Sequence, residues 1–415
     1  GEAMAQSFVP KGYSIVPFGT PSDVVVLNTC TVTDTADKEC RRLVRRALRD
    51  NPGARVVVAG CYAQLKPEEV ASIDGVSLVV GNREKPRVAD LLASLDAARD
   101  VVSVEVSDIA SADDFGPAFM SGGDEYTRAF LKIQDGCDYS CAFCTIPKAR
   151  GPSRSQSVDA TIEQAAYLVG AGYAEIVLTG VNAGDYQDGQ SKLYDLLERL
   201  HNVDGLRRLR VSSIEPNLLE GRIIDLAAAS DRFVPHFHMP LQSGSDRILG
   251  LMKRRYRSDL FRSRVETIVS KLPGAAIGVD VIAGFPGESE ADFEATRRFL
   301  ADLPIAYLHV FTYSERADTP AAAMPEVVTR QERKRRTNIL RELSQRKQSQ
   351  FWRGQLGTVR PVLFERERTS GIAEGLTDNF IRVRIPGAQA ERGTVRSVLL
   401  TELGPEGVVG ELVTV

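Results

Sequence analysis

Residues 136–144 read GCDYSCAFC, and this stretch decides the fold of the largest part of the chain. Its three cysteines, Cys137, Cys141 and Cys144, have the spacing C-x3-C-x2-C. They directly follow the first of several candidate strands, which alternate with helical stretches such as residues 158–169, 244–252 and 289–300. The candidate strands are residues 129–134, 175–179, 209–212, 236–239, 276–283 and 308–312. Six such units predict an α/β fold, an incomplete (β/α)6 barrel whose site lies at the carboxyl ends of the strands.

The cysteine loop is typical of an iron–sulfur site. Three thiolates bound to a four-iron cluster leave one iron without a protein ligand. That iron can bind the amino and carboxylate groups of S-adenosylmethionine. Electron transfer into the sulfonium then breaks a carbon–sulfur bond and produces a 5'-deoxyadenosyl radical. The alternative is a zinc site, but structural zinc commonly takes four ligands in two C-x2-C pairs, and no fourth cysteine or nearby histidine follows Cys144. We therefore predict a 4Fe-4S cluster on Cys137, Cys141 and Cys144.

Residues 1–100 predict a small α/β domain with a parallel sheet. The apolar runs at residues 24–27, 56–59 and 78–80 are predicted strands, and residues 37–50 are a predicted helix that ends before Asn51-Pro52-Gly53. Ligands bind beyond the carboxyl ends of parallel strands, and Cys30 and Cys61 both lie at such ends. The alternative is that both are small buried residues.

Two further segments complete the predicted domain organisation. Residues 101–125 are rich in Ser, Asp and Gly and are interpreted as a linker, and residues 126–350 form the barrel domain, which ends in a long charged helix. Residues 351–415 contain short Val-, Ile- and Leu-rich runs broken by Gly, which predict a small antiparallel β-barrel of about five strands. Arg382 and Arg384 alternate along one of these strands, as expected either for RNA binding or for an ordinary solvated face.

Composition excludes a membrane protein. The chain has 415 residues, 43% of them hydrophobic, and no apolar run long enough to cross a bilayer. It begins without a signal peptide, so we expect a cytoplasmic location and no disulfides. The formal net charge is -3, but basic residues cluster at positions 207–210, 253–257 and 333–336. These clusters suit either solvated helix faces or an anionic partner.

Several longer runs resemble the methylthiotransferases of the radical S-adenosylmethionine superfamily, and the resemblance covers essentially the whole chain. The runs are LKIQDGC at residues 131–137, CTIP at 144–147, ARGPSRS at 149–155, HMPLQSGS at 238–245 and DVIAGFPGE at 280–288. The C-terminal barrel resembles the TRAM domain, an RNA-binding module. The runs QDGCD at 134–138 and RRY at 254–256 are most similar to the bacterial branch that acts on N6-threonylcarbamoyladenosine in tRNA.

The resemblance implies a second 4Fe-4S cluster, bound by three cysteines of the N-terminal domain. Cys30 and Cys61 match two of the three positions. The third is expected in a Gly-Cys turn after a first strand, and residues 1–415 contain neither. Either both lie upstream of Gly1, and residues 1–6 are the helix that follows, or the chain departs from the family at this position. Cys40 is a possible substitute, although a cysteine within a helix usually has no such role.

The resemblance also implies contacts with S-adenosylmethionine at the strand ends. Thr179 and Gly180 would meet its amino group, Ser212 and Glu215 its ribose, and Ile282 and Gly284 its adenine. Phe143 would pack on the adenine, unless it is simply a buried aromatic side chain. His236 and His238 share one face of a strand and are interpreted as a core pair rather than metal ligands. No catalytic acid or base is expected, because radical chemistry removes hydrogen atoms.

The expected function is therefore methylthio transfer to C2 of N6-threonylcarbamoyladenosine beside the anticodon of a tRNA. The expected cofactors are two 4Fe-4S clusters and S-adenosylmethionine. We also expect an external electron donor, a monomer, and phosphate contacts from Arg150 and Arg154. Three alternatives stay open: isopentenyladenosine in tRNA as the substrate, an aspartate of a ribosomal protein as the substrate, or a non-enzymatic RNA-binding scaffold with a structural metal.

Overall fold

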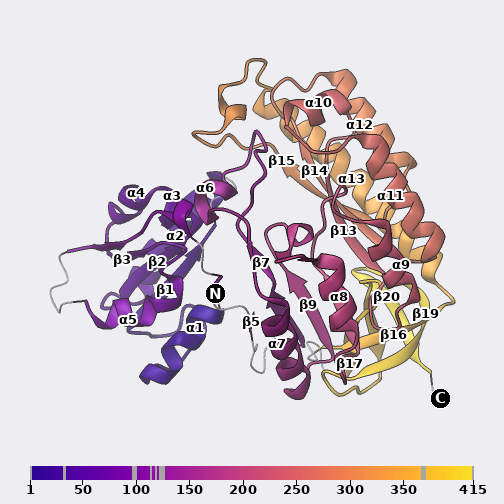
Figure 1. Cartoon of the computed structure of the whole chain (residues 1–415), viewed down its shortest axis with the longest axis horizontal. Coiled ribbons are helices and arrows are strands. Elements are labelled where there is room, and N and C mark those ends of the chain that lie inside the picture. Colours follow the sequence, from indigo (N-terminus) through magenta and orange to yellow (C-terminus); the bar gives the residue numbers. More distant parts are fainter. Residues whose placement is uncertain are drawn as a thin grey trace. The chain divides into compact units, whose positions relative to one another are not determined.

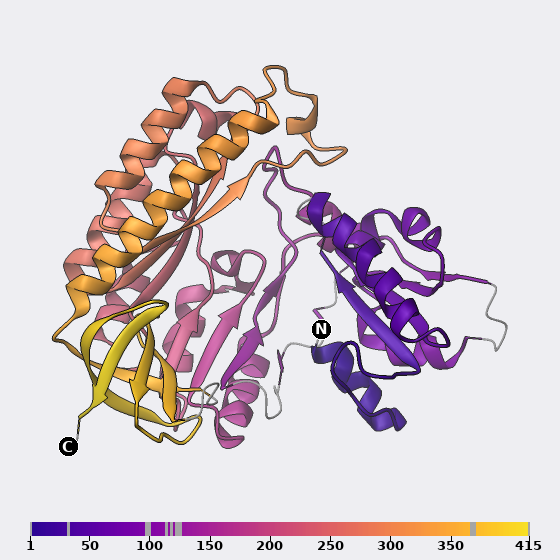
Figure 2. The same cartoon turned by 180° about the vertical axis from the view of Figure 1, so that it is seen from behind.

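The computed structural model describes residues 2–30, 34–95, 101–112, 115–116, 119–120, 127–365 and 371–413 (Figures 1 and 2). Contacts divide the chain into two compact units. Unit 1 comprises Gly1–Ala118, Asp135–Arg154 and Ser314–Ala323, and unit 2 comprises Phe119–Gln134, Ser155–Tyr313 and Met324–Val415. The cysteine loop therefore belongs to the same unit as the N-terminal sheet. The domain boundaries at residues 100, 125 and 350 stay predictions.

Unit 1 contains a four-stranded parallel sheet in the order β1-β2-β3-β4. Its strands are β1 (Val24–Thr29), β2 (Arg55–Gly60), β3 (Val76–Val80) and β4 (Ser103–Glu105). Alternate residues of β2 enter two different cores, Val56 and Val58 on one face and Val57 and Ala59 on the other, which explains its unbroken apolar sequence. The three predicted strands are confirmed, and the segment interpreted as a linker contains β4, the fourth strand of the sheet.

Helices cover both faces of this sheet. The α-helices of unit 1 are α1 (Glu2–Phe8), α2 (Asp34–Asp50), α3 (Cys61–Leu65), α4 (Pro67–Ala71), α5 (Val88–Ala93) and α6 (Ile146–Arg150). Its 3-10 helices are η1 (Val9–Lys11), η2 (Lys85–Arg87), η3 (Ile109–Ser111) and η5 (Pro320–Ala323). Val44 of α2 packs in one core, whereas Met4 and Phe8 of α1 pack in the other. The helix predicted at the start of the chain is thus part of the second core.

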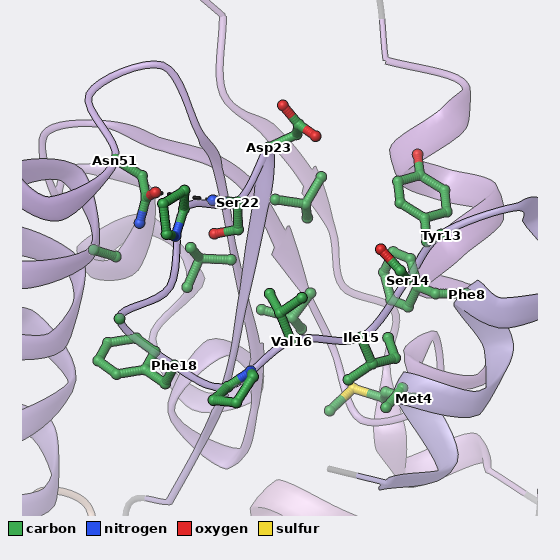
Figure 3. A pocket seen from close by; sticks show the side chains of 18 of the residues that line it. Met4, Phe8, Tyr13, Ser14, Ile15, Val16, Phe18, Ser22, Asp23 and Asn51 are labelled. Carbon is green, nitrogen blue, oxygen red and sulfur yellow. Dashed lines mark hydrogen bonds between the residues drawn. The ribbon is translucent and has the colours of Figure 1, made fainter.

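A pocket of about 400 Å³ lies beside β1 (Figure 3). Met4, Phe8, Ile15, Val16 and Phe18 supply much of its apolar lining. One end is closed by a hydrogen bond of 2.9 Å from the Ser22 backbone N–H to Asn51 Oδ1. No cysteine lines this pocket, so it is separate from the predicted cluster sites.

Unit 2 contains the six parallel strands predicted for the incomplete barrel. They are β6 (Arg128–Lys132), β9 (Glu175–Thr179), β12 (Arg208–Val211), β13 (His236–Gln242), β14 (Ala276–Ala283) and β15 (Tyr307–Thr312). They form two sheets, β12-β9-β6-β5 and β13-β14-β15, in which β5 (Phe119–Met120) is antiparallel to β6. A single bridge between Leu209 and Phe233 connects the segments of β12 and β13. The prediction of a partial (β/α)6 barrel is confirmed, with a break after its third strand.

The helices of unit 2 follow the strands and lie on their outer side (Figure 1). They are α7 (Val158–Gly170), η4 (Ala183–Asp185), α8 (Leu193–His201), α9 (Gly221–Ala229), α10 (Asp246–Leu251), α11 (Ser258–Lys271), α12 (Glu290–Asp302) and α13 (Arg330–Gln355). Short strands β7 (Gln134–Asp135), β8 (Arg154–Ser155), β10 (Gln187–Asp188) and β11 (Ser191–Lys192) complete the segment. Ser157, Ser289 and Thr329 each cap a helix start with a side-chain oxygen, so polar residues fix where these helices begin. Figure 2 shows α13 running alongside β15, whose Leu308 N–H donates to Ser344 Oγ at 2.9 Å.

A closed five-stranded barrel follows α13. Its strands are β16 (Val359–Phe364), β17 (Ile372–Thr377), β18 (Arg382–Pro386), β19 (Val395–Gly404) and β20 (Gly407–Leu412), in the order β16-β17-β18-β20-β19. Val362, Phe364 and Val398 fill its core. The small barrel is confirmed, but it is not wholly antiparallel, because β18 and β20 run parallel. Gly407 makes this pairing close: a Cβ there would lie 2.2 Å from the Arg382 carbonyl oxygen.

The turn between β17 and β18 is bound at the amino-terminal ends of the large barrel's strands. Arg208 donates to the Thr377 carbonyl oxygen at 2.8 Å, and Arg210 to the Asp378 carbonyl oxygen at 3.1 Å. Both guanidinium groups also pair with the buried Glu175, at 2.9 and 2.7 Å. Burial alone would raise the pKa of Glu175, but the two cations hold that pKa below its ordinary value. We call Glu175, Arg208 and Arg210 the turn socket.

Phe380 completes this attachment. Its ring lies 4.7 Å from the His236 ring and 5.0 Å from the Arg210 guanidinium, measured to the ring centroids. Its φ of +67° is uncommon for a residue with a side chain, so the surrounding contacts hold an unfavourable backbone conformation in place. The small barrel is therefore packed against the large one within unit 2.

Candidate functional site

Gly136 sets the start of the cysteine loop. Its φ is +71°, and a Cβ there would lie 1.9 Å from the Pro152 carbonyl oxygen, so only glycine fits. The backbone N–H of Cys137 donates to the Gly151 carbonyl oxygen at 3.1 Å. The two ends of the loop are thereby held together, and Cys137, Cys141 and Cys144 lie on one short segment between them.

The surroundings of these thiols suit thiolates. The Tyr139 N–H lies 3.5 Å from Cys137 Sγ, and the Ile146 N–H lies 3.4 Å from Cys144 Sγ, so backbone donors face both sulfurs. In the part of the chain that the structure describes, no three cysteines bring their sulfurs within 4.8 Å of one another. Tetrahedral zinc, with Zn–S bonds of about 2.3 Å, needs sulfurs about 3.8 Å apart. The loop fits a cluster, in which each thiolate binds its own iron, better than a single zinc ion.

Cys30 and Cys61 follow directly paired positions of neighbouring strands. Thr29 at the end of β1 pairs with Gly60 at the end of β2. Gly60 has a φ of +115°, and a Cβ there would meet the Thr29 carbonyl oxygen at 2.4 Å. The glycine therefore allows the two strand ends to approach, which brings the backbone before Cys30 beside that of Cys61. Cys30 is exposed, and Cys61 is buried.

Helix α6, which follows the cysteine loop, lies close to Cys61. Asn82 Nδ2 donates to the Ala149 carbonyl oxygen at 2.6 Å and lies 3.6 Å from Cys61 Sγ. Arg150 pairs with Asp135 at 3.0 Å. Burial opposes the charge of Arg150, but the negative charge of Asp135 raises the pKa of Arg150. Asn82 was not predicted, although it lies just beyond the carboxyl end of β3, where ligand-binding side chains are expected.

Arg150 and Arg154, from which phosphate contacts are expected, both have partners within unit 1. Arg154 donates to the carbonyl oxygens of Arg150 and Pro152 at 2.7 and 3.0 Å. Both arginines therefore stabilise the turn that follows the cysteine loop.

Cys40 has the properties of a structural cysteine. It is buried in the core between α2 and the sheet. Burial, together with the nearby charge of Asp37, raises the pKa of its thiol to about 11. This environment disfavours the thiolate that a cluster requires.

The predicted strand-end residues of unit 2 lie where β9, β12 and β14 end. Thr179 and Gly180 close β9, and a Cβ on Gly180 would lie 3.1 Å from Gln134, so the chain passes closely there. Gln134 Oε1 accepts the Asn182 N–H at 2.8 Å. Within the described residues, both amide atoms of the buried Asn182 side chain lack a hydrogen-bond partner. A buried amide without a partner is what a ligand-binding side chain leaves when its ligand is absent, so this strand end fits a polar cofactor.

The other predicted residues have structural contacts of their own. Glu215 forms an ion pair with Arg254, and burial raises the pKa of Glu215 in spite of that pair. Gly284 has a φ of +80°, and a Cβ there would meet Arg333 Cγ at 2.3 Å, so close packing of α13 requires this glycine. Ser212 is partly exposed and Ile282 is buried. Phe143 is partly exposed in unit 1.

The interpretation of His236 and His238 as core residues fits His236, whereas His238 is only partly buried and has a different partner. His236 is buried, and its Nε2 lies 2.8 Å from the Tyr307 hydroxyl. His238 instead joins Asp280 and His309 in a separate group. Asp280 and His309 were not singled out from the sequence, although the alternation of β14 and β15 places them on the same side as His238.

Most arginines of the three basic clusters serve structure rather than an anionic partner. Arg208 and Arg210 belong to the turn socket, and Arg254 pairs with Glu215. Arg333 donates to the carbonyl oxygens of Val328 and Tyr313, and Arg336 pairs with the buried Glu288. In the C-terminal barrel, Arg382 and Arg384 share a face but pair with Glu365 and Glu374.

The chain is similar in sequence and in fold to known proteins. Residues 131–300 match the family model "Radical SAM superfamily", and residues 1–81 match "Uncharacterized protein family UPF0004". A methyltransferase of this class, TsrM from Kitasatospora setae, has the same fold at a TM-score of 0.57 and 15% identity, over 77% of this chain and 71% of that one. The fold and the cysteine loop define a radical S-adenosylmethionine enzyme, with that cofactor and a 4Fe-4S cluster.

The chain belongs to the family of threonylcarbamoyladenosine tRNA methylthiotransferases. The Bacillus subtilis protein of that name, MtaB, is 37% identical over 422 residues, covering 100% of this chain and 93% of the relative. The Aquifex aeolicus protein is 38% identical, covering 96% of each chain. The Thermotoga maritima protein is 33% identical over 98% of this chain and 92% of the relative.

Proposed function

We propose that this protein adds a methylthio group to C2 of N6-threonylcarbamoyladenosine beside the anticodon of tRNA. The similarity to the Bacillus subtilis enzyme, 37% identity along the full chain, carries the proposal. The cysteine loop, the partial barrel and the C-terminal barrel supply the parts that such a reaction needs: a cluster site, a substrate-holding scaffold and a module that suits RNA.

In this proposal, Cys137, Cys141 and Cys144 hold the first cluster. When bound, the cluster and S-adenosylmethionine supply the one-electron cleavage of a carbon–sulfur bond that begins radical chemistry. The N–H groups of Tyr139 and Ile146 stabilise the negative thiolates. In unit 2, the unpartnered side-chain amide of Asn182 suits a polar ligand. Gly136 and Gly180 permit the close backbone approaches that these positions need.

Cys30 and Cys61 are proposed as two ligands of a second 4Fe-4S cluster, which takes part in sulfur transfer. Their positions after paired residues of β1 and β2 support this assignment. Asn82 and Arg150 also support it, because an amide donor and a guanidinium group near Cys61 stabilise a thiolate.

The remaining expectations form part of the same proposal. The tRNA is the macromolecular partner, an external donor supplies the electron, and the protein acts as a monomer in the cytoplasm. No helix in the described ranges is long and apolar enough to cross a membrane.

The test is anaerobic reconstitution followed by reaction with tRNA. Reconstituted protein, S-adenosylmethionine and a chemical reductant are incubated with tRNA that carries N6-threonylcarbamoyladenosine, and its nucleosides are analysed by mass spectrometry. We expect the 2-methylthio nucleoside from the wild type and from Cys40→Ala, but not from Cys141→Ala. Unchanged nucleosides from an iron-loaded wild type, or zinc in place of iron, would refute the proposal. Modification of isopentenyladenosine instead would assign the related branch.

A further inference from the structure

The strands β13, β14 and β15 present two chemically different sides. Met239, Val279 and Leu308 belong to the apolar core that these strands form with the outer helices. The alternate residues, His238, Asp280 and His309, therefore point to the inward side of the partial barrel. That side carries imidazoles and a carboxylate where a purely structural barrel would carry branched apolar side chains.

These three side chains form one connected group, which we call the His–Asp–His group. His238 Nε2 lies 2.7 Å and His309 Nδ1 lies 3.2 Å from the same oxygen, Asp280 Oδ1. Because a carboxylate accepts hydrogen bonds, both nitrogens act as donors. Burial opposes the charge of Asp280, but these two hydrogen bonds lower the pKa of Asp280 to about 2. The carboxylate thus fixes the orientation of both rings.

The group is only partly covered. The His309 side chain is 49% exposed, and in the described part of the chain nothing bonds to its Nε2. Two positions further along β15, on the same inward side, Phe311 is 46% exposed. In the opposite direction, toward the amino-terminal ends of the strands, the His236 ring packs against the rings of Tyr307 and Phe380. The exposed ring of Phe311 therefore lies next to the His–Asp–His group on the inward side of β15.

We propose that the His–Asp–His group binds the N6 substituent of the target adenosine, while the purine ring lies against Phe311. This inference rests on the proposed function and assigns the substrate contacts of unit 2. Purines that leave their stack are commonly held against aromatic side chains. The threonylcarbamoyl substituent carries a carboxylate, a hydroxyl and ureido N–H groups. His309 binds as the imidazolium: its Nδ1–H donates to Asp280 and its Nε2–H donates to the carboxylate of the substituent. The Asp280 carboxylate also accepts from the ureido N–H or hydroxyl groups of the substituent.

The same three residues could in principle bind a divalent cation, since their ligand atoms lie within 4.8 Å of one another. The geometry argues against this. In a metal site the lone pairs of all three ligands converge on one point outside them, and the imidazoles bind through unprotonated nitrogens. Here both nitrogens point at Asp280 Oδ1 and share their protons with it.

The test compares the binding of two anticodon stem-loops, one with N6-threonylcarbamoyladenosine and one with unmodified adenosine. We expect the reconstituted wild type to prefer the modified stem-loop. His309→Phe removes a hydrogen bond to a charged group, so we expect this preference to fall by about tenfold while affinity for the unmodified stem-loop stays the same. His309→Gln keeps a donor and should retain part of the preference. His201→Gln, on α8 and outside the inward side, is the matched control.

The outcomes are distinguishable. A wild type that cannot methylthiolate the modified tRNA refutes the proposed function, whatever the binding data show. An active wild type whose preference survives in both His309→Phe and Phe311→Leu overturns the inference. A tightly bound zinc or manganese ion in the wild type, detected by elemental analysis and absent from His309→Phe, also overturns it and assigns a metal site.

Discussion

Gly136 is the residue on which the cysteine loop depends most directly. We expect Gly136→Ala to prevent correct closure of the loop, because a methyl group 1.9 Å from the Pro152 carbonyl oxygen forces the backbone apart. After anaerobic reconstitution, the iron bound per protein should fall by the content of one cluster. Gly53→Ala, at a position with nothing within 4 Å, is the control. Full iron content in Gly136→Ala would contradict the role assigned to this turn.

The cysteines should differ in reactivity as their environments differ. In cluster-free protein at pH 8, we expect iodoacetamide to alkylate the exposed Cys30 and to spare Cys40. A thiol whose pKa is about 11 is a thiolate in only about one molecule in a thousand at pH 8. Because the pKa is raised, labelling of Cys40 should increase as the pH rises toward 11. Peptide mass spectrometry measures both rates, and urea-unfolded protein should show equal rates.

Adjacent arginines of α13 should contribute unequally to stability. The Arg336 side chain is 6% exposed and pairs with the buried Glu288, whereas Arg335 is 45% exposed. Arg336→Met leaves a buried carboxylate without its cation, which costs about 3 kcal/mol, while Arg335→Met costs less than about 1 kcal/mol. Urea unfolding followed by fluorescence of the single tryptophan, Trp352, compares the two. An equal loss of unfolding free energy in the two variants would show that burial of the Arg336–Glu288 pair does not determine its contribution to stability.

At the scale of elements, the strands were predictable and their partners were not. Apolar runs identified β1, β2 and β3, and the alternation of strand-like with helical stretches identified the six barrel strands, because each pattern reflects local burial. The strand β4 has only three residues and lies in a Ser- and Asp-rich segment, so it has no such signal. Likewise, a run of arginines has the same sequence pattern whether it meets solvent or a buried glutamate far along the chain.

The attachment of the β17–β18 turn can be tested as an element. Phe380 and Leu403 are both 37% exposed, but only Phe380 packs on His236 and Arg210. We expect Phe380→Ala to lower the thermal midpoint by several degrees and to speed hydrogen exchange at residues 377–381, since it loses ring stacking and cation–π contacts worth about 1–2 kcal/mol. Leu403→Ala should change neither. Similar behaviour of the two variants would mean that the turn is not anchored through its ring.

At the scale of the whole chain, the types of candidate site residue could be predicted from the sequence, but the residues that surround them in the fold could not. Cysteine spacing is a local property, and it singles out Cys137, Cys141 and Cys144 as candidate ligands directly. The approach of Asn82 and Arg150 to Cys61, and the meeting of His238, Asp280 and His309, join segments that are far apart in sequence. Such groups follow from tertiary packing, which one sequence does not encode in any local pattern.

Binding of tRNA should depend on arginines without internal partners. Arg396, on β19, is exposed and has no ion pair within the described residues, whereas Arg384 pairs with Glu374 at 3.0 Å. If Arg396 contacts a phosphate, Arg396→Gln lowers the slope of log affinity against log salt by about one, and Arg384→Gln leaves it unchanged. Titrations of tRNA at several salt concentrations measure both slopes. An unchanged slope in Arg396→Gln would remove β19 from the RNA-binding surface.

The turn socket restricts how this architecture can be recombined. Glu175, Arg208 and Arg210 are buried charges that are satisfied partly by the backbone of the β17–β18 turn. A chimera that received its small barrel from another protein would leave two guanidinium groups facing a foreign surface, and a truncated chain would expose them to water. The C-terminal barrel therefore cannot be exchanged by itself. A chimera that folds has to keep the turn-socket residues of the large barrel together with the β17–β18 turn that they bind.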